Sequence, residues 1–248
     1  MIWDKIKAVR DRMRNLEESS FCSMVVVAAG SSQRMGSDKI LASLSDMPVL
    51  ARTLTVFQNC DMVDEIVVVT RAEILEQVAD LCKNYNFGKV TKVLLGGKTR
   101  TESALAGVSA VSTKASLIGI HDGARPLVTN DLIERTILAA REHQSAVPVI
   151  PSTDTLKLVE EDGFVSGTLD RSRVFRVQTP QVFSAVLIKG ALSNAVAKDI
   201  SLTDDSTAME AMNVKTYTVP GDTENLKLTS PEDMAVAESI LRRRREQA

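Results

Sequence analysis

Residues 25–39, VVVAAGSSQRMGSDK, join a run of valines to a loop of small, polar and basic residues. The valine run is apolar at every position, which is typical of a strand buried on both faces of a sheet. Ligands of open α/β sheets bind beyond the carboxyl ends of the strands, so this stretch predicts an α/β fold with a candidate phosphate-binding loop. The loop residues that carry this prediction are Ala28, Ala29, Gly30, Arg34 and Lys39.

The loop matches neither of the common glycine-rich phosphate motifs. A P-loop needs Lys directly after its last glycine, whereas Gly36 is followed by Ser37 and Asp38. The sequence has no G-x-G-x-x-G pattern, which disfavours a dinucleotide cofactor. On these residues alone, a turn with two solvated basic side chains stays an open alternative.

Strand-like and helix-like segments alternate over the first 150 residues. Short runs rich in Val, Ile and Leu are separated by segments of helical periodicity, which predicts a doubly wound, mostly parallel sheet. The predicted strands are 24–29, 65–70, 92–95, 116–121 and 146–150. The predicted helices are 48–60, 72–85, 101–112 and 130–144.

Residues of about 151–175 break this alternation. Partly polar runs flank Glu161-Asp162-Gly163, a pattern typical of an antiparallel hairpin. A hairpin inserted here has few core partners nearby, so we expect an arm that packs against a second subunit. The chain is therefore predicted to hold an N-terminal helical extension, 1–22, and one domain, 23–248, that carries the arm.

Both ends of the chain are predicted to be helical. Apolar residues recur at helical spacing within residues 2–16, which indicates an amphipathic helix docked on the body or on a partner. The last helix is expected to begin at Ser230-Pro231, with Asp233 completing a capping box. It ends in RRRRE, 242–246, where basic residues suit the negative end of the helix dipole. Nucleic-acid binding by that run is the less favoured alternative.

The overall composition excludes several classes of protein. The chain has 30 Lys and Arg against 32 Asp and Glu in 248 residues, so neither nucleic acid nor a membrane surface is an expected partner. No apolar run approaches the roughly 20 residues of a membrane-spanning helix. The three cysteines show no C-x-x-C spacing. They fit buried thiols in a reducing compartment, so a cytoplasmic location is expected.

Five motifs follow one another in the order found in a known family. They are AAGSSQRMGSDK (28–39), GGKTRTESALAG (96–107), HDGARP (121–126), DTLK with LDRSRVFRVQTPQ (154–157 and 169–181), and TDDSTAME with NLKLTSPEDM (203–210 and 225–234). Together they resemble the 2-C-methyl-D-erythritol 4-phosphate cytidylyltransferases, enzymes of the non-mevalonate isoprenoid pathway. The resemblance runs from about Met24 to Leu241. It implies a Rossmann-like nucleotidyltransferase that transfers CMP from CTP to methylerythritol phosphate, with Mg²⁺.

The resemblance assigns the CTP half of the site. It implies that Arg34 and Lys39 grip the triphosphate and stabilise the transition state, in which negative charge grows on the phosphoryl oxygens. Arg100 is a further candidate to assist on this side. The residues matching positions that hold cytosine and ribose are Ala28, Ala29, Gly30, Gly97 and Ser103.

The resemblance also assigns the acceptor half. Asp122 and Arg125 match positions near the metal and the methylerythritol phosphate, with Asp122 the expected Mg²⁺ ligand. His121 is expected to be a core histidine, because a phosphate nucleophile is already ionised and needs no base.

Four further positions match residues that bind the second substrate. In the family the hairpin is a dimer arm that completes the partner subunit's site, so a homodimer is implied. Arg171 and Lys227 would orient the acceptor phosphate for attack. The four positions are Thr155, Arg171, Thr179 and Lys227.

One departure and two alternatives accompany the resemblance. The link Gly36-Ser37-Asp38 is shorter than the family's usual stretch before Lys39, and it lacks the usual Pro. A ribitol 5-phosphate cytidylyltransferase is the nearest alternative, but those enzymes tend to carry a bulkier residue than Ala124 before the Arg. The remote alternative is a non-catalytic nucleotide-binding or scaffold protein. Such a protein would be expected to lack the basic pair or the acceptor residues.

Overall fold

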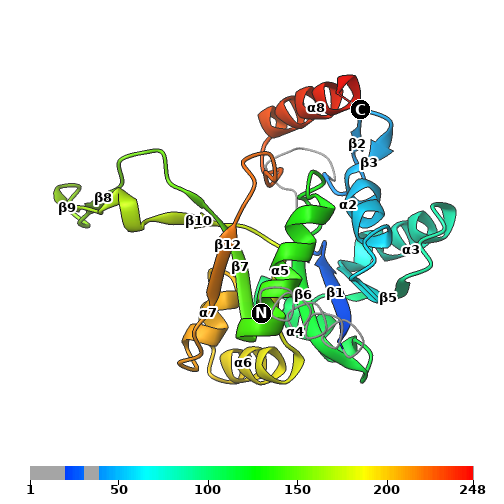
Figure 1. The fold of residues 1–248 in the computed structure, drawn as a ribbon, viewed down its shortest axis with the longest axis horizontal. Helices are drawn as coiled ribbons and strands as arrows, with labels where there is room; N and C mark the ends of the chain where they lie inside the picture. The colour runs from blue at the N-terminus through cyan, green and yellow to red at the C-terminus, as the bar shows by residue number, and fades with distance from the viewer. Residues whose placement is uncertain (1–19, 31–38, 248) are drawn as a thin grey trace, which may run out of the picture.

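The computed structural model describes residues 20–30 and 39–247. Its centre is an eight-stranded sheet in the order β10–β7–β11–β6–β1–β4–β5, with β12 paired to β7 (Figure 1). The parallel pairs are β1 with β4, β1 with β6, β4 with β5, and β7 with β12. In contrast, β10 and β11 run antiparallel to their neighbours. The predicted α/β, mostly parallel sheet is therefore confirmed. The strands are β1 (Phe21–Val27), β4 (Glu65–Thr70), β5 (Val90–Leu95), β6 (Ala115–Asp122), β7 (Ser145–Pro151), β10 (Phe175–Val177), β11 (Gln181–Ser184) and β12 (Tyr217–Pro220).

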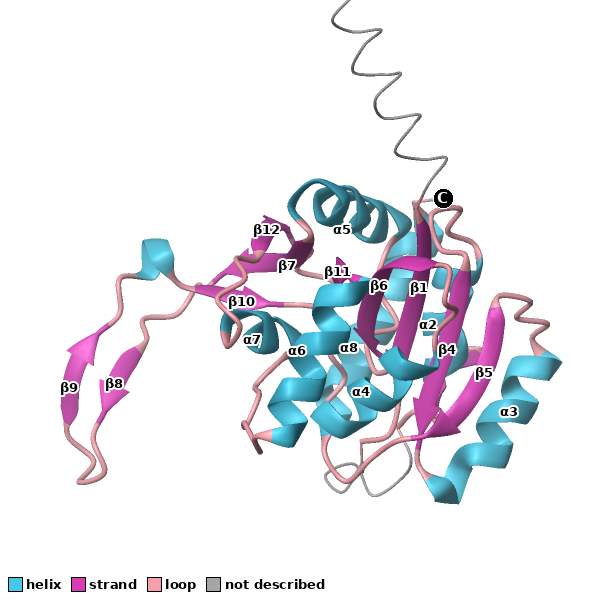
Figure 2. Ribbon diagram, turned by 90° about the horizontal axis from the view of Figure 1, so that it is seen from below, coloured by secondary structure: helices cyan, strands magenta, loops and turns pink. Residues whose placement is uncertain are grey.

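Helices cover both faces of this sheet (Figure 2). Successive residues of a strand point to opposite faces, so Met24 and Val26 of β1 join the core under α2, α3 and α5. Val25 joins the core under α4, α6 and α7. This explains why the run 24–27 of β1 is apolar at every position, whereas the buried Ser23 hydroxyl donates to the Glu65 Oε2 at 2.6 Å. The helices are α2 (Val49–Gln58), α3 (Leu75–Asn84), α4 (Arg100–Ala110), α5 (Asn130–His143), α6 (Ala185–Ala197), α7 (Asp205–Glu210) and α8 (Pro231–Glu246), with short 3₁₀ turns η1 (Ala72–Ile74) and η2 (Arg171–Arg173).

The predicted hairpin arm is present and projects from the body (Figures 1 and 2). β8 (Lys157–Val159) and β9 (Val165–Thr168) pair antiparallel as a separate two-stranded sheet. At the tip, the Gly163 N–H donates to the Glu160 carbonyl at 2.9 Å, and Gly163 has φ +88°. A residue with a side chain rarely adopts that conformation, which explains the glycine at this turn.

The C-terminal helix α8 lies beside the small hairpin of β2 (Ser43–Leu44) and β3 (Met47–Pro48) (Figure 1). It begins with the predicted capping box between Ser230 and Asp233, and Pro231 is its first residue.

Two sequence predictions lie outside the described residues. They are the amphipathic helix of the N-terminal extension and the placement of Arg34. Among the helices that the structure describes, none is long and apolar enough to cross a membrane.

Candidate active site

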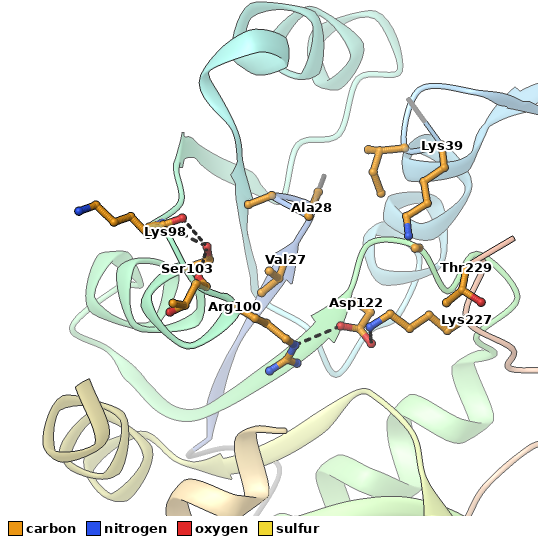
Figure 3. Close-up of a pocket in the computed structure, with 15 residues that line it drawn as sticks. Val27, Ala28, Lys39, Lys98, Arg100, Ser103, Asp122, Lys227 and Thr229 are labelled. Atoms are coloured by element: carbon orange, nitrogen blue, oxygen red, sulfur yellow. Dashed lines mark hydrogen bonds and ion pairs between the residues drawn. The ribbon is translucent and has the colours of Figure 1, made fainter. Parts of the chain in front are cut away.

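A cavity of about 570 Å³ opens at the carboxyl ends of β1 and β6 (Figure 3). Parallel strands bring their carboxyl ends to one edge of the sheet, so residues distant in sequence meet there. The lining residues are Val27, Ala28, Ala29, Gly30, Lys39, Ile40, Gly97, Lys98, Thr99, Arg100, Ser103, Asp122, Ala124, Lys227 and Thr229.

The loop after β1 forms a wall of this cavity made largely of backbone. The Ala28 N–H donates to the Val69 carbonyl at 2.7 Å, which ties the loop to β4. Ala28 is buried, and a Cβ built on Gly30 would meet no atom within 4 Å. The described residues therefore leave open space beside Gly30.

The turn before α4 adjoins this wall, since a Cβ built on Gly96 would lie 2.8 Å from the Ala29 Cβ. Thr99 and Glu102 make a reciprocal capping box that fixes the first turn of the helix. A Cβ on Gly97 would lie 2.2 Å from the Glu102 Cβ, so the turn requires glycine here. The Ser103 hydroxyl donates to the Thr99 carbonyl at 2.9 Å and accepts from the Gly97 N–H at 3.2 Å. Ser103 therefore shapes the turn from inside.

Asp122 stands at the centre of the site, at the end of β6. Three cations surround its carboxylate: Lys227 Nζ lies 3.0 Å from Oδ2, Arg125 Nε lies 3.4 Å from Oδ2, and Arg100 Nε lies 3.5 Å from Oδ1. Burial alone would raise the pKa of Asp122, but Lys227, Arg100 and Arg125 outweigh burial and lower it well below its usual range. The group is therefore a carboxylate at neutral pH.

Arg100 is fixed from behind by a buried acid. Its Nη1 and Nη2 donate to the Asp205 Oδ1 and Oδ2 at 2.8 and 2.7 Å, the bidentate arrangement that guanidinium and carboxylate favour. Burial would lower the pKa of Arg100, but Asp205 and Asp122 raise it. The neighbouring Asp204 has a different role: it caps α7 by accepting a hydrogen bond from the Thr207 N–H at 3.0 Å.

Behind Asp122, a hydrogen-bonded chain occupies both nitrogens of His121. The Asp122 N–H donates to the Thr179 hydroxyl at 3.1 Å, and that hydroxyl lies 3.0 Å from His121 Nδ1. Nε2 lies 3.3 Å from the Arg125 carbonyl. Burial lowers the pKa of His121 to about 3, so the ring is neutral. Thr179 then donates to Nδ1, and Nε2–H donates to the carbonyl. His121 is the satisfied core histidine that the sequence predicts.

The structure brings most of the predicted site residues together. Arg125 and Thr179 contact Asp122 from outside the cavity lining. Thr155 and Arg171 lie on the arm, away from the cavity; Arg171 Nη1 donates to the Thr153 carbonyl at 3.2 Å. The predicted residues that line the cavity are Ala28, Ala29, Gly30, Lys39, Gly97, Ser103, Asp122 and Lys227.

Sequence reasoning missed the partnership of Arg100 and Asp205. Asp204 and Asp205 are adjacent acids, and only one of them can cap α7. The other is 1% exposed, and a buried acid requires a cationic partner. That requirement is the signal that could have paired Asp205 with Arg100.

The donor set argues against a magnesium ion held by these protein groups alone. Magnesium sites in proteins combine one or two carboxylates with substrate oxygens and water. The described residues contain no cluster of three or more His, Cys, Asp or Glu side chains, and the carboxylate of Asp122 already faces three cations. Asp122 could therefore hold Mg²⁺ only together with phosphate oxygens and water, not as part of a cage of protein ligands.

Comparison with known proteins identifies the family. The family model of 2-C-methyl-D-erythritol 4-phosphate cytidylyltransferase matches residues 22–243. A relative of that name from Alkaliphilus oremlandii is 38% identical over 234 residues, covering 93% of this chain and 99% of its own. Another from Dehalococcoides mccartyi is 41% identical over 222 residues, covering 89% and 96%.

Solved structures agree with the sequence relatives. The crystal structure of a 4-diphosphocytidyl-2C-methyl-D-erythritol synthase from Anaerococcus prevotii superposes with a TM-score of 0.83 at 29% identity, covering 92% of this chain and 99% of that one. A Thermus thermophilus 2-C-methyl-D-erythritol 4-phosphate cytidylyltransferase gives 0.72 at 27% identity, covering 90% and 99%. The chain belongs to the 2-C-methyl-D-erythritol 4-phosphate cytidylyltransferase family of nucleotidyltransferases.

Proposed function

We propose that this enzyme transfers CMP from CTP to 2-C-methyl-D-erythritol 4-phosphate, giving 4-diphosphocytidyl-2-C-methyl-D-erythritol and pyrophosphate. The observation that carries the proposal is the convergence of Lys227 and Arg100 on Asp122 beside the small-residue loop, in a chain of this family (Figure 3). One side of the cavity is lined by small residues and the other by charged residues.

The reaction needs positioning and charge stabilisation more than proton transfer. An oxygen of the acceptor phosphate attacks the α-phosphorus of CTP, and the bond from that phosphorus to the bridging oxygen breaks. Pyrophosphate leaves with the electron pair, and negative charge grows on the phosphoryl oxygens. The attacking oxygen is already ionised, so a base is unnecessary. The neutral, fully bonded His121 is consistent with such a reaction.

On the CTP side, we assign the cytosine and ribose to the wall formed by the loop after β1 and the turn before α4. Backbone groups of Ala28, Ala29 and Gly30 would hydrogen-bond a pyrimidine edge, and Gly97 with Ser103 shapes the adjoining turn. Lys39 extends into the cavity (Figure 3) and would bind the triphosphate. Arg34 is proposed as its partner by its place in the same loop.

On the acceptor side, Lys227 is the proposed phosphate ligand. Its ammonium group now neutralises Asp122 at 3.0 Å, and an incoming phosphate would compete for the same positive charge. Asp122 would then accept hydrogen bonds from the polyol hydroxyls. Arg125 and Thr179 would hold Asp122 in place.

We further propose a homodimer in which the arm supplies Thr155 and Arg171 to the partner's acceptor half. Both residues lie on a projecting arm in the single chain (Figure 1). The arm also exposes large apolar side chains: Phe164 is 75% exposed, Val159 59% and Phe175 50%. Apolar surface of this kind is typical of an interaction surface.

Magnesium is proposed as a companion of the nucleotide. Among the described residues that line the cavity, Asp122 is the one carboxylate, so phosphate oxygens and water would have to supply most ligands, as is common for Mg²⁺. No step above depends on the ion. A cytoplasmic location is proposed because all three cysteines are free, buried thiols.

Pyrophosphate release tests the proposed activity. Purified enzyme would be assayed with CTP and either methylerythritol phosphate or ribitol 5-phosphate, with and without Mg²⁺. Turnover with methylerythritol phosphate is expected. Turnover with ribitol phosphate alone would overturn the substrate assignment, and CTP binding without turnover on either acceptor would point to a non-catalytic protein.

A further inference from the structure

Lys227 lies on a segment without regular secondary structure, residues 221–230 between β12 and α8. A catalytic lysine on such a segment needs restraint from its surroundings, because an unrestrained backbone would not hold the ammonium group in one place. The described residues show what supplies that restraint.

Several contacts within the site hold the inner side of the segment; its start is held by Gln178 Nε2, which donates to the Asp222 carbonyl at 2.7 Å. The Leu228 N–H donates to the Ala124 carbonyl at 2.8 Å. Arg125 Nη1 donates to the Asn225 carbonyl, also at 2.8 Å. The latter two contacts join the segment to the loop after β6, which carries Asp122. They leave the outer side of the segment to α8.

Arg244, in the last turn of α8, binds the same two loops from the outside. Its Nε donates to the Glu224 Oε2 at 2.9 Å, and its Nη2 lies 2.8 Å from the same oxygen. Its Nη1 and Nη2 also lie 3.2 and 3.3 Å from the Leu127 carbonyl. One guanidinium thus bridges the Lys227 segment and the loop after Asp122.

An apolar cluster lies between α8 and these loops. Leu228 is the residue next to Lys227 and is fully buried in this cluster. The cluster therefore fixes the distance between helix and segment, and Arg244 fixes the segment's outer edge. Its buried members are Leu44, Val49, Leu127, Leu228 and Ala237.

The remaining arginines of the run differ in their contacts. Arg243 also pairs with Glu224, and Arg245 pairs with Asp46 at 2.9 Å. Arg242 is exposed and makes no ion pair with any residue that the structure describes. Three of the four arginines form ion pairs with carboxylates of this chain, which argues against a nucleic-acid-binding surface.

We propose that Arg244 is a positioning residue for the acceptor half of the site, acting through Glu224 and the Leu127 carbonyl to hold the Lys227 segment against the Asp122 loop. The inference rests on the proposed role of Lys227 as the acceptor-phosphate ligand. It gives the basic run a function inside the enzyme. The CTP half lies on other loops, so the effect of Arg244 is specific to the second substrate.

Steady-state kinetics on the full chain tests this proposal. The variants are Arg244→Ala and Glu224→Gln, with Arg242→Ala as the matched control in the same run. We expect the KM for methylerythritol phosphate to rise about tenfold in both test variants, within the range that a small misplacement of a reacting group produces. The KM for CTP should stay unchanged. Arg244→Lys should restore only part of the loss, because an ammonium group cannot bridge both acceptors in the guanidinium geometry.

Each other outcome has a defined meaning. An acceptor KM for Arg244→Ala equal to that of Arg242→Ala would overturn the proposal, as would a parallel rise in both KM values. If Arg244→Ala does not fold, the same KM split in Glu224→Gln decides the question. Lys227→Ala, measured in the same assay, distinguishes the proposed role of Lys227 from that of Arg244. If Lys227→Ala leaves the acceptor KM unchanged, the proposed role of Lys227 fails rather than that of Arg244.

Discussion

The body and the arm of this enzyme differ in how their charged residues are paired. In the body, Asp122 lies at the end of a buried strand, and its charge is balanced by three cations from other elements. On the arm, Arg171 bonds a nearby backbone carbonyl, and its apolar neighbours face solvent. The first arrangement is complete within one chain. The second leaves apolar surface exposed in one chain, which is the basis for the proposed dimer contact.

The largest expected effect belongs to the body. Lys227→Ala should lower kcat/KM by about 100- to 1000-fold, because loss of one preorganised charge at a phosphoryl-transfer site has a cost of this order. Lys83→Ala, at an exposed position on α3 with its side chain 79% exposed, is the control and should be near wild type. Pyrophosphate release at saturating CTP measures both. Near-full activity in Lys227→Ala would mean that the cluster around Asp122 is structural.

The second prediction joins the two regions. Lys39→Ala and Arg171→Ala should each be nearly inactive, but mixing them should restore about a quarter of wild-type activity, since random pairing leaves that share of sites intact if each site draws on both subunits. The measurement is activity after incubating equimolar variants long enough for subunit exchange. Mixing two preparations of the same variant is the control. Exchange without restored activity would place Lys39 and Arg171 in one subunit's site, or Arg171 outside it.

The third prediction concerns pH and the buried core behind Asp122. Burial lowers the pKa of His121 to about 3, whereas an unfolded histidine titrates near about 6.5. Between these values the unfolded chain binds a proton that the folded chain excludes. This group's contribution to stability is therefore intact above about pH 6.5 and falls on acidification, by up to about 1.4 kcal/mol per pH unit.

Chemical denaturation between pH 5 and 6.5 measures this slope. His121→Asn should flatten it, because the titrating group is gone. Asp122, whose pKa is depressed in the folded chain, loses its stabilising contribution only below about pH 5, where the unfolded carboxyl begins to bind protons. An unchanged slope in His121→Asn would show that other groups cause the loss of unfolding free energy at acid pH.

Much of the body was predictable from its residues. The valine run and the other long apolar strands have a clear pattern, and each predicted strand overlaps one in the sheet. β10, β11 and β12 were not predicted, because strands of three or four residues are too short to show a period. The hairpin was predictable from its turn, where Gly163 adopts φ +88°.

The sequence predicts which residues belong to the site, but not which of them contact one another. The motifs point to Asp122 and Lys227, yet nothing in their spacing states that Arg100 also reaches Asp122 or that Asp205 holds Arg100. Such contacts depend on how loops from distant parts of the chain meet at the sheet edge. The arginine run shows the same limit: its charge is evident in the sequence, whereas its pairing with Glu224 requires the packed position of α8.

The smallest expected effect, that of Phe164→Ala on the arm, is best measured against the same substitution in the body. Phe57→Ala removes a fully buried ring that packs edge-on against His121, with centroids 4.8 Å apart. It should cost about 3–5 kcal/mol of unfolding free energy. Phe164, 75% exposed on the arm, should cost less than about 0.5 kcal/mol when changed to Ala, as is usual for surface positions. If the arm is a dimer contact, however, Phe164→Ala should weaken self-association.

Sedimentation over a dilution series separates these two readouts, because the midpoint of the monomer–dimer transition moves even when the fold does not. A Phe164→Ala variant that dimerises like wild type would place the interface elsewhere on the arm or the body. A large loss of unfolding free energy at low concentration, where monomer prevails, would show that the arm packs on its own chain. Either result would remove the distinction between a self-sufficient body and an arm that depends on a partner.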